Sequence, residues 1–173
     1  MATDLTDLKG SVNVSLRLTA TKAGDLSSPN DPLSKAINTA FTFGTGEDQI
    51  NQLWSDSRSL AGAASESLDL SGVLTNAFGV TCQFSKVKAI LIHNISDDAA
   101  AILEVGGAAA AQVPLFFKHT SDIILVNQGA YFLACDPVTG YTVTGTTADI
   151  LKMLNASADK TLTYEIVIAG LSA

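Results

Sequence analysis

Residues 43–93 of this chain read FGTGEDQINQLWSDSRSLAGAASESLDLSGVLTNAFGVTCQFSKVKAILIH. The first half of this segment is rich in turn-forming residues and carries the only Trp of the chain, whereas the second half ends in a long apolar strand. That final strand, residues 86–95, is apolar on both faces, which predicts a covering layer on each side of it. A second sheet would supply one layer, and an arm of the chain or a neighbouring copy would supply the other.

Short strand patterns recur outward from this segment and are mostly bounded by Gly, Asn, Asp, Ser or Pro. Strands are predicted over residues 12–18, 36–43, 67–70, 80–84, 87–92, 101–105, 123–126, 131–134, 141–143, 150–154 and 162–169. Residues 126–130 and 136–140 are predicted to be hairpin turns. Helical patterns are sparse, and only residues 48–54 and 73–78 suggest a short helical turn each. The pattern therefore argues for a β-sandwich or a β-barrel.

The N-terminal part of the chain has a character of its own. Alternation of apolar and polar residues over positions 12–19 predicts a strand with one wet face, and residues 22–32 have the composition of a loop. We therefore divide the chain into residues 1–32, an N-terminal strand and loop that can serve as a docking arm, and residues 33–173, a β-sandwich domain. The expected interface residues are Val12, Val14, Leu16, Leu18, Leu26, Pro29 and Pro32.

Composition narrows the classes of function. Of the 173 residues, 47% are apolar and only 16% are charged, against about a quarter in ordinary domains. Few charges favour a protein whose faces are covered by partner chains. The net charge of −7 without a basic stripe predicts no direct nucleic-acid partner. The sequence also shows no signal peptide and no stretch long enough to span a bilayer, so we expect no membrane partner and folding in the cytoplasm.

We find no residues arranged for catalysis, for a cofactor or for a metal. His93 and His119 are the only candidate bases; His93 sits in an apolar strand and His119 in a loop, so structural and surface roles are favoured. A Gly-x-Ser-x-Gly turn is absent, and no His or carboxylate spacing matches a metal site. Cys82 and Cys135 are expected to be buried free thiols rather than a disulfide. We expect a protein that is not an enzyme.

Trp54, Asp56 and Arg58 form the one cluster in which a site could be hidden. An Arg can pair with a carboxylate and stack on an indole ring. We expect these three side chains to form a structural clamp that fixes an irregular segment onto the sandwich, with a ligand site as the alternative.

The order of several motifs resembles a family of small virion structural proteins of tailed bacteriophages. The motifs are Gly44-Thr45-Gly46, Trp54, Asp56, Arg58, Leu68-Asp69-Leu70, Gly72, Ala77-Phe78-Gly79 and residues 86–89, followed by residues 105–109, 127–130, 136–141, 149–152 and 164–170. The resemblance begins near Ala36, so the N-terminal part is additional to it. The turn at residues 127–130, where Pro-Gly-Gly is more usual, and Cys135 also depart from the family pattern.

The resemblance implies an all-β fold, an antiparallel, jelly-roll-like β-sandwich with one or two short helical turns. It further implies a capsid decoration or cement protein that binds the major capsid protein or another virion protein and stabilises the head. We expect a homo-oligomer, with a trimer favoured, located in the virion after assembly in the host cytoplasm. A tail, baseplate or fibre component and a receptor- or glycan-binding module are the alternatives.

Overall fold

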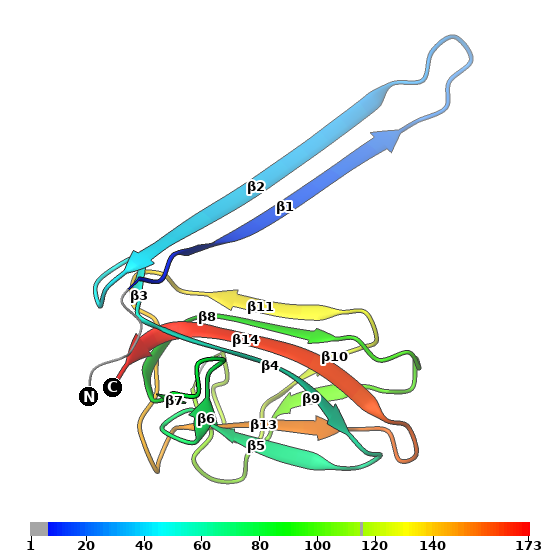
Figure 1. Ribbon diagram of the computed structural model, residues 1–173. Coiled ribbons are helices and arrows are strands. Elements are labelled where there is room, and N and C mark those ends of the chain that lie inside the picture. The colour runs from blue at the N-terminus through cyan, green and yellow to red at the C-terminus, as the bar shows by residue number, and fades with distance from the viewer. Residues whose placement is uncertain (1–6, 115) are drawn as a thin grey trace.

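The computed structural model describes residues 7–114 and 116–173 and shows a β-sandwich with a long projecting hairpin (Figure 1). The hairpin and its base consist of β1 (Gly10–Thr21), β2 (Asn30–Phe43) and β3 (Gln49–Ile50). Within the described residues every regular element is a strand, which confirms the predicted all-β class.

The sandwich has two sheets, which we name by their position relative to the hairpin. The arm-side sheet has the order β11-β8-β14-β4, with β12 also paired to β8; its strands are β4 (Gln52–Leu60), β8 (Phe84–Asn94), β11 (Tyr131–Cys135), β12 (Tyr141–Thr142) and β14 (Leu162–Ser172). The far sheet has the order β10-β9-β13-β5; its strands are β5 (Ser65–Asp69), β9 (Leu103–Gly106), β10 (Ile123–Val126) and β13 (Ile150–Asn155). A small ribbon joins β6 (Leu74–Thr75) to β7 (Thr81–Cys82).

The connectivity is that of a rolled-up hairpin. Of the eight main sandwich strands, the first pairs with the last (β4 with β14), and the second with the second-last (β5 with β13). The third pairs with the third-last (β8 with β11), and the two in the middle pair with each other (β9 with β10). All these pairs are antiparallel, and successive pairs alternate between the two sheets. This is the jelly-roll arrangement, in agreement with the prediction.

The core lies between the two sheets and follows the period-two alternation of the strands. The arm-side sheet contributes Ile90, Ile92, Ile166 and Ile168, and the far sheet contributes Leu103, Val105, Leu151 and Met153, all of which are buried. Strand ends are held by two fully buried amides. Asn155 donates from Nδ2 to the carbonyl oxygens of Leu60, Ala61 and Lys160, and Asn94 donates to those of Ala101 and Val126.

Both predicted helical turns are wrong. Residues 48–54 enter strands β3 and β4, and residues 73–78 enter β6 and its turn. In the first case the tertiary contacts override the local pattern, because β4 forms the edge of the arm-side sheet and every one of its residues pairs with β14.

The two predicted hairpin turns are turns, but they do not connect paired strands. Residues 127–130 carry the chain from β10 in the far sheet to β11 in the arm-side sheet, so they cross the sandwich edge. Residues 136–140 connect β11 to β12, and both strands pair with β8, one after the other. Turn composition identifies a reversal or step of the chain, but the pairing partner is decided elsewhere in the sequence.

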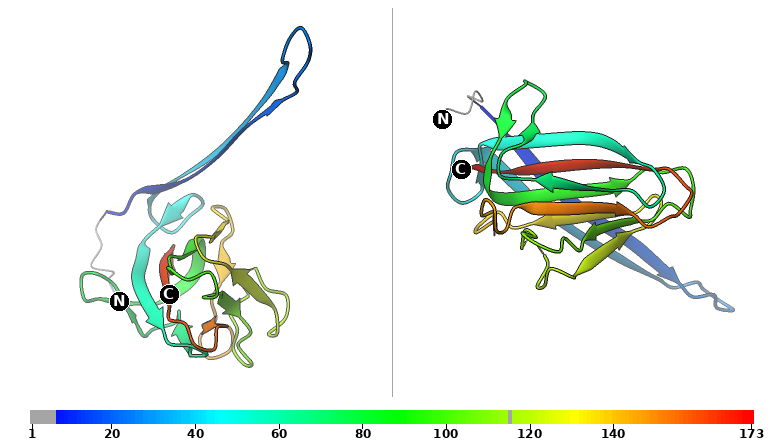
Figure 2. Two further views of the ribbon diagram at one scale, coloured as in Figure 1. Left: turned by 90° about the vertical axis from the view of Figure 1, so that its right-hand side faces the viewer. Right: turned by 90° about the horizontal axis from the view of Figure 1, so that it is seen from below.

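The hairpin of β1 and β2 leaves the sandwich from its base and extends far beyond it (Figure 2). β1 and β2 pair from Gly10↔Phe41 to Thr21↔Asn30, and the loop between them is closed by a hydrogen bond from Lys22 N to the Pro29 carbonyl oxygen (3.2 Å). We call residues 10–43 the arm. The boundary expected after residue 32 falls within β2, and residues 1–6 of the N-terminal part lie outside the described residues.

Candidate functional site: an apolar arm above an apolar groove

The arm has one apolar and one polar face, because residues opposite each other in a β-ladder point to the same side. The pairs on the apolar face are Val14↔Ile37, Leu16↔Lys35 and Leu18↔Leu33. Those on the other face include Asn13↔Asn38 and Arg17↔Ser34. We call Val14, Leu16, Leu18, Leu33 and Ile37 the arm stripe; its side chains are exposed, with Leu16 at 52% and Leu18 at 54%.

An exposed stripe of this kind is unusual for a two-stranded hairpin. A hairpin on its own is marginally stable in water and normally needs a third strand or a packing surface. Contiguous exposed apolar side chains generally mark a contact surface. The stripe therefore has the features of a surface that is buried in an assembly.

The base of the arm is fixed firmly to the arm-side sheet. Phe41, Ile50 and Ala89 are buried together, and Leu8, Val12, Cys135 and Ala169 pack around them. Backbone hydrogen bonds reinforce the base, from Thr42 N to the Asp48 carbonyl oxygen (3.0 Å) and from Asp48 N to that of Pro137 (3.0 Å). The direction in which the arm leaves the body is therefore set by packing and by hydrogen bonds.

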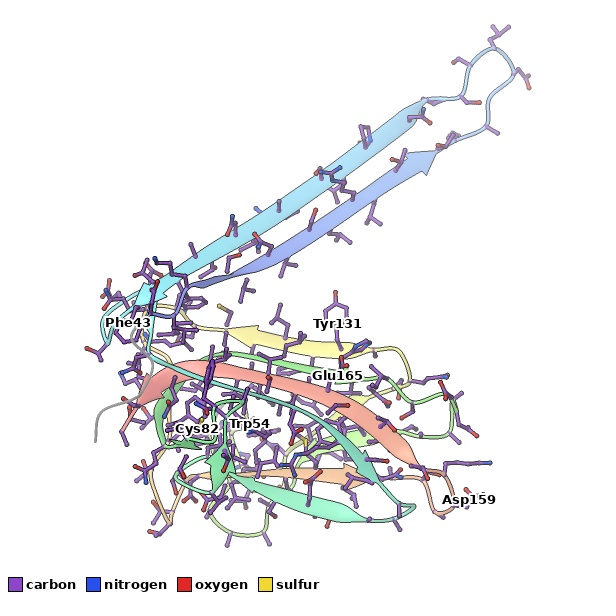
Figure 3. All side chains as sticks on the ribbon, viewed as in Figure 1. Phe43, Trp54, Cys82, Tyr131, Asp159 and Glu165 are labelled. Atoms are coloured by element: carbon purple, nitrogen blue, oxygen red, sulfur yellow. The ribbon has the colours of Figure 1, made fainter. Side chains whose placement is uncertain are left out.

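Beyond this base a groove opens between the arm and the outer face of the arm-side sheet. Its volume is about 730 Å³, and its lining comes from β1 on one side and from β8, β11 and β14 on the other. Tyr131 points from β11 toward the arm, and Glu165 lies on the neighbouring part of the sheet (Figure 3). The groove thus has one wall on the arm and a floor on the sheet.

The groove floor consists of three cross-strand rows. The row nearest the base is Cys135–Ala89–Ala169–Leu53, the middle row is Leu133–Leu91–Val167–Ser55, and the outermost row is Tyr131–His93–Glu165–Ser57. The first row is covered by the arm base. The middle row is open to solvent, with Leu91 at 37% and Val167 at 38% exposed. The predicted second apolar face of the central strand is therefore present, but the arm covers only one end of it.

The seven predicted interface residues do not all share one surface. Val14, Leu16 and Leu18 belong to the arm stripe, whereas Val12 packs at the arm base. Leu26 and Pro29 lie in the loop at the arm tip, and Pro32 pairs with Thr19 on the polar face. Sequence reasoning missed Leu33 and Ile37, although the alternation of apolar residues at 33, 37, 41 and 43 was a signal for an earlier start of this strand.

The three residues of the predicted structural clamp, Trp54, Asp56 and Arg58, all lie on β4, where Arg58 contacts the other two. Arg58 Cζ lies 5.5 Å from the centre of the Trp54 ring, and Arg58 Nε lies 3.0 Å from Asp56 Oδ2. The Nε hydrogen does not point at that oxygen, so this contact is an ion pair without a hydrogen bond. Trp54 is only 2% exposed and belongs to the core, so it offers no stacking face to a ligand.

Two residues that sequence reasoning did not assign to the clamp connect it to the far sheet. Arg58 Nη1 donates to Glu66 Oε2, and the hydroxyl of the fully buried Tyr164 donates to Glu66 Oε1 (2.8 Å). Glu66 lies on β5 of the far sheet, whereas Arg58 and Tyr164 are paired neighbours in the arm-side sheet. Burial, together with the hydrogen bond to Glu66, raises the pKa of Tyr164 above its usual range. The cluster therefore ties the two sheets together at their edge.

The two histidines lie in different surroundings. His93 Nδ1 lies 3.9 Å from Glu165 Oε2 on the groove floor. A His beside a carboxylate can act as a base only if a nucleophile is within reach, and the hydroxyl in this row is that of Ser57. Ser57 lies on the other side of Glu165, two strand spacings or roughly 10 Å from His93. His93 is therefore not placed to take a proton from Ser57. His119 is exposed, and its backbone N–H donates to Asp122 Oδ2 (2.8 Å).

The two cysteines are not paired with each other. Both Cys82 and Cys135 are free thiols, as expected, but only Cys82 is fully buried, while Cys135 is half-buried at the arm base. In the described part of the chain, no group of three or more His, Cys, Asp or Glu side chains is arranged to hold a metal ion.

Lys88 is a further buried polar residue that the sequence did not reveal. Its ammonium group donates to the carbonyl oxygens of Pro137 (2.8 Å) and Val138 (2.6 Å), next to a β-bulge between β8 and β14. It fastens the 136–140 turn to the arm-side sheet.

No helix in residues 7–114 and 116–173 is long and apolar enough to cross a membrane.

No protein-family model and no curated protein matches this chain.

Proposed function

We propose that this chain is a non-enzymatic structural protein of a tailed-phage virion, acting as a capsid decoration or cement protein that binds the major capsid protein and stabilises the head. The observation that carries the proposal is the arm: a long hairpin, anchored rigidly at its base, that presents an uncovered apolar stripe. The sequence resemblance to virion proteins and the jelly-roll body agree with this function.

The body and the arm suit different parts of the task. The sandwich has a continuous core, two buried Asn amides and an edge clamp, so it can bear load without rearranging. The arm extends the reach of each copy to a neighbouring virion protein, and its tip loop carries the exposed Leu26. Many modest contacts of this kind, repeated over a particle, combine into strong attachment through avidity.

The first test is the copy number of the chain in purified particles, measured by quantitative mass spectrometry. A copy number in simple ratio to the major capsid protein is expected for a decoration protein. A few copies to a few dozen would place the protein in the tail, baseplate or neck, and its absence from particles would reject a virion function.

The second test concerns the arm. A variant in which residues 15–36 are replaced by a short Gly-containing turn keeps the arm base, including Val12 and Phe41, and removes most of the stripe and the tip. We expect this variant to fold but to lose binding to undecorated particles. Normal decoration by the shortened protein would show that the arm is not the attachment element.

A receptor- or glycan-binding module is less well supported by the geometry. Such a module needs exposed aromatic rings around a concave site, but Trp54 is in the core and Tyr141 is half-buried. Two aromatic residues line the groove, but Phe41 is buried at the arm base and only Tyr131 is exposed, at 66%; the other lining residues are mainly aliphatic.

A further inference from the structure

The chain carries two uncovered apolar surfaces that do not cover each other. One is the arm stripe, and the other is the middle row of the groove floor, Leu133–Leu91–Val167. The arm diverges from the sheet as it leaves its base (Figures 1 and 2). Of the stripe residues only Val14 lines the groove, and the other four remain exposed. We infer that the groove receives the arm stripe of a second copy of this chain, so that copies are linked by arm exchange.

Charge is the first reason for choosing a second copy as the occupant. Lys35 is the only charged side chain in the rows Val14↔Ile37, Leu16↔Lys35 and Leu18↔Leu33, and it makes no ion pair among the described residues. Asp31 lies on the same face in the next row toward the tip, opposite Ala20 and beyond the stripe. Glu165 is the carboxylate on the groove floor, and among the described residues the only basic side chain within ion-pair distance of it is His93, at 3.9 Å. A positive charge on the arm and a negative charge on the floor are complementary within one sequence.

Row spacing is the second reason. Lys35 is two residues from Ile37 and Leu33, and Glu165 is two residues from Val167. Adjacent rows on one face of a sheet are about 6.7 Å apart in both surfaces. An arm placed with Lys35 over the Glu165 row therefore sets an apolar arm row over Leu91 and Val167. The ion pair and the apolar contact are satisfied together.

Continuity with an existing contact is the third reason. The arm base already packs against Ala89 and Ala169 of the same sheet through Val12 and Phe41. The open middle row directly extends this contact. A second arm laid on it would pack sheet against sheet, as the two layers of a sandwich do, at about 10 Å. The exchanged contact thus repeats, between copies, a mode of packing that the chain uses within itself.

Charge reversal on purified full-length protein tests this inference. We expect the unchanged chain to form a homo-oligomer in sedimentation or light-scattering measurements, and Lys35→Glu or Glu165→Lys alone to raise its dissociation constant roughly tenfold or more, because like charges then meet. Mixing the two variants should restore assembly at least in part, because wherever a copy of one variant meets a copy of the other, the arm meets a floor of opposite charge. Restoration by mixing is specific to exchange between copies.

Matched controls separate this contact from a general effect of charge. Arg17→Glu makes the same charge change on the polar face of the arm, and Glu104→Lys makes it on the outer surface of the far sheet. Both should leave the oligomer unchanged. Leu18→Thr on the arm and Leu91→Thr on the floor retain strand propensity and should each weaken assembly.

Three outcomes would overturn the inference. The unchanged protein could be a monomer at high concentration, the four contact variants could assemble as the unchanged chain does, or mixing could fail to restore assembly. A monomer with a protected arm stripe would show that the arm folds onto its own sheet. These measurements use protein free of particles, so arm exchange can fail while attachment to the virion holds, and the reverse is equally possible.

Discussion

Strands β14 and β1 have nearly the same pattern and opposite surroundings. In β14 the alternate residues Leu162, Tyr164, Ile166 and Ile168 are buried between the two sheets. In β1 the alternate residues Val14, Leu16 and Leu18 are exposed along the arm. Alternation of apolar and polar residues predicts that one face of a strand is covered, but the covering layer can come from the same chain or from another one. The body covers the apolar face of β14 with its own second sheet, whereas the apolar face of the arm is left uncovered within the chain.

The largest contrast should come from one substitution made in both regions. Leu151→Ala removes a fully buried side chain from the core and should lower the free energy of unfolding by about 3–5 kcal/mol. Leu16→Ala removes an exposed side chain from the arm and should change it by less than about 0.5 kcal/mol. Urea unfolding at a protein concentration low enough to keep the chain monomeric measures both values.

An equal loss in the two variants would mean that the arm stripe is already buried in the monomer. If the Leu16→Ala variant becomes less stable than the unchanged chain only as protein concentration rises, the stripe is buried by association.

Substituting one Asn in the body and one on the arm tests the same difference between the two regions with polar side chains. Asn155→Ala removes one donor from each of three carbonyl oxygens, of which that of Ala61 keeps the Ala64 N–H, and also removes the acceptor for the Ser157 N–H. We expect a loss of about 2–3 kcal/mol in the free energy of unfolding. Asn38→Ala on the polar face of the arm should cost less than about 0.5 kcal/mol. Thermal or urea unfolding distinguishes them, and a small effect at Asn155 would contradict its assigned role at the strand ends.

The edge clamp should have a moderate effect. Arg58→Met retains much of the aliphatic packing on Trp54 and removes the charged partner of Glu66. Because both side chains are partly exposed to water, we expect a loss of roughly 1–2 kcal/mol. Arg17→Met on the arm is the matched control and should be nearly neutral. A neutral Arg58→Met variant would show that the Tyr164–Glu66 hydrogen bond alone holds the sheet edges.

The smallest expected effect is a pH dependence at alkaline pH. The pKa of Tyr164 is raised in the folded state, chiefly by burial and then by the hydrogen bond to Glu66. Above the normal Tyr pKa of about 10, the unfolded chain loses this proton while the folded chain keeps it, so the free energy of unfolding falls with rising pH. The loss should be roughly 1 kcal/mol over the first pH unit above about 10. This part of the slope should be missing in Tyr164→Phe.

Urea unfolding of the two proteins at several alkaline pH values measures the slopes, and phenolate absorbance follows the ionisation directly. Equal slopes in the two proteins would mean that Tyr164 ionises in the folded state.

The sequence was sufficient for local structure wherever alternation and turn residues agreed. Residues 123–126, 131–134 and 150–154 were predicted as strands and lie in β10, β11 and β13. It failed at β4, where polar residues and a helix-like spacing around Trp54 concealed a strand at a sheet edge. It also failed at the start of β2, where Asn30, Asp31 and Pro32 looked like loop residues. On a two-stranded arm these residues face solvent, so they meet no requirement for apolar side chains.

The sequence predicted only part of the candidate site. The stripe on β1 and the two apolar faces of β8 are visible as patterns of alternating or continuous apolar residues. The pairing of Leu16 with Lys35, and the row that brings Glu165 beside His93, are not visible. Each depends on the register between strands that are separated in the sequence.

By itself, the sequence determined an all-β chain, because period-two alternation bounded by turn residues permits strands and disfavours helices. It also indicated that β8 is apolar on both faces and needs a covering layer on each side, and that β1 has one apolar face. Only the tertiary structure decided that the first strand of the sandwich pairs with the last, and that Arg58 and Tyr164 meet on Glu66. It also decided that the arm projects away from the body (Figure 2) and that the arm stripe stays exposed. Those outcomes depend on long-range register and on packing at the arm base, which no local pattern encodes.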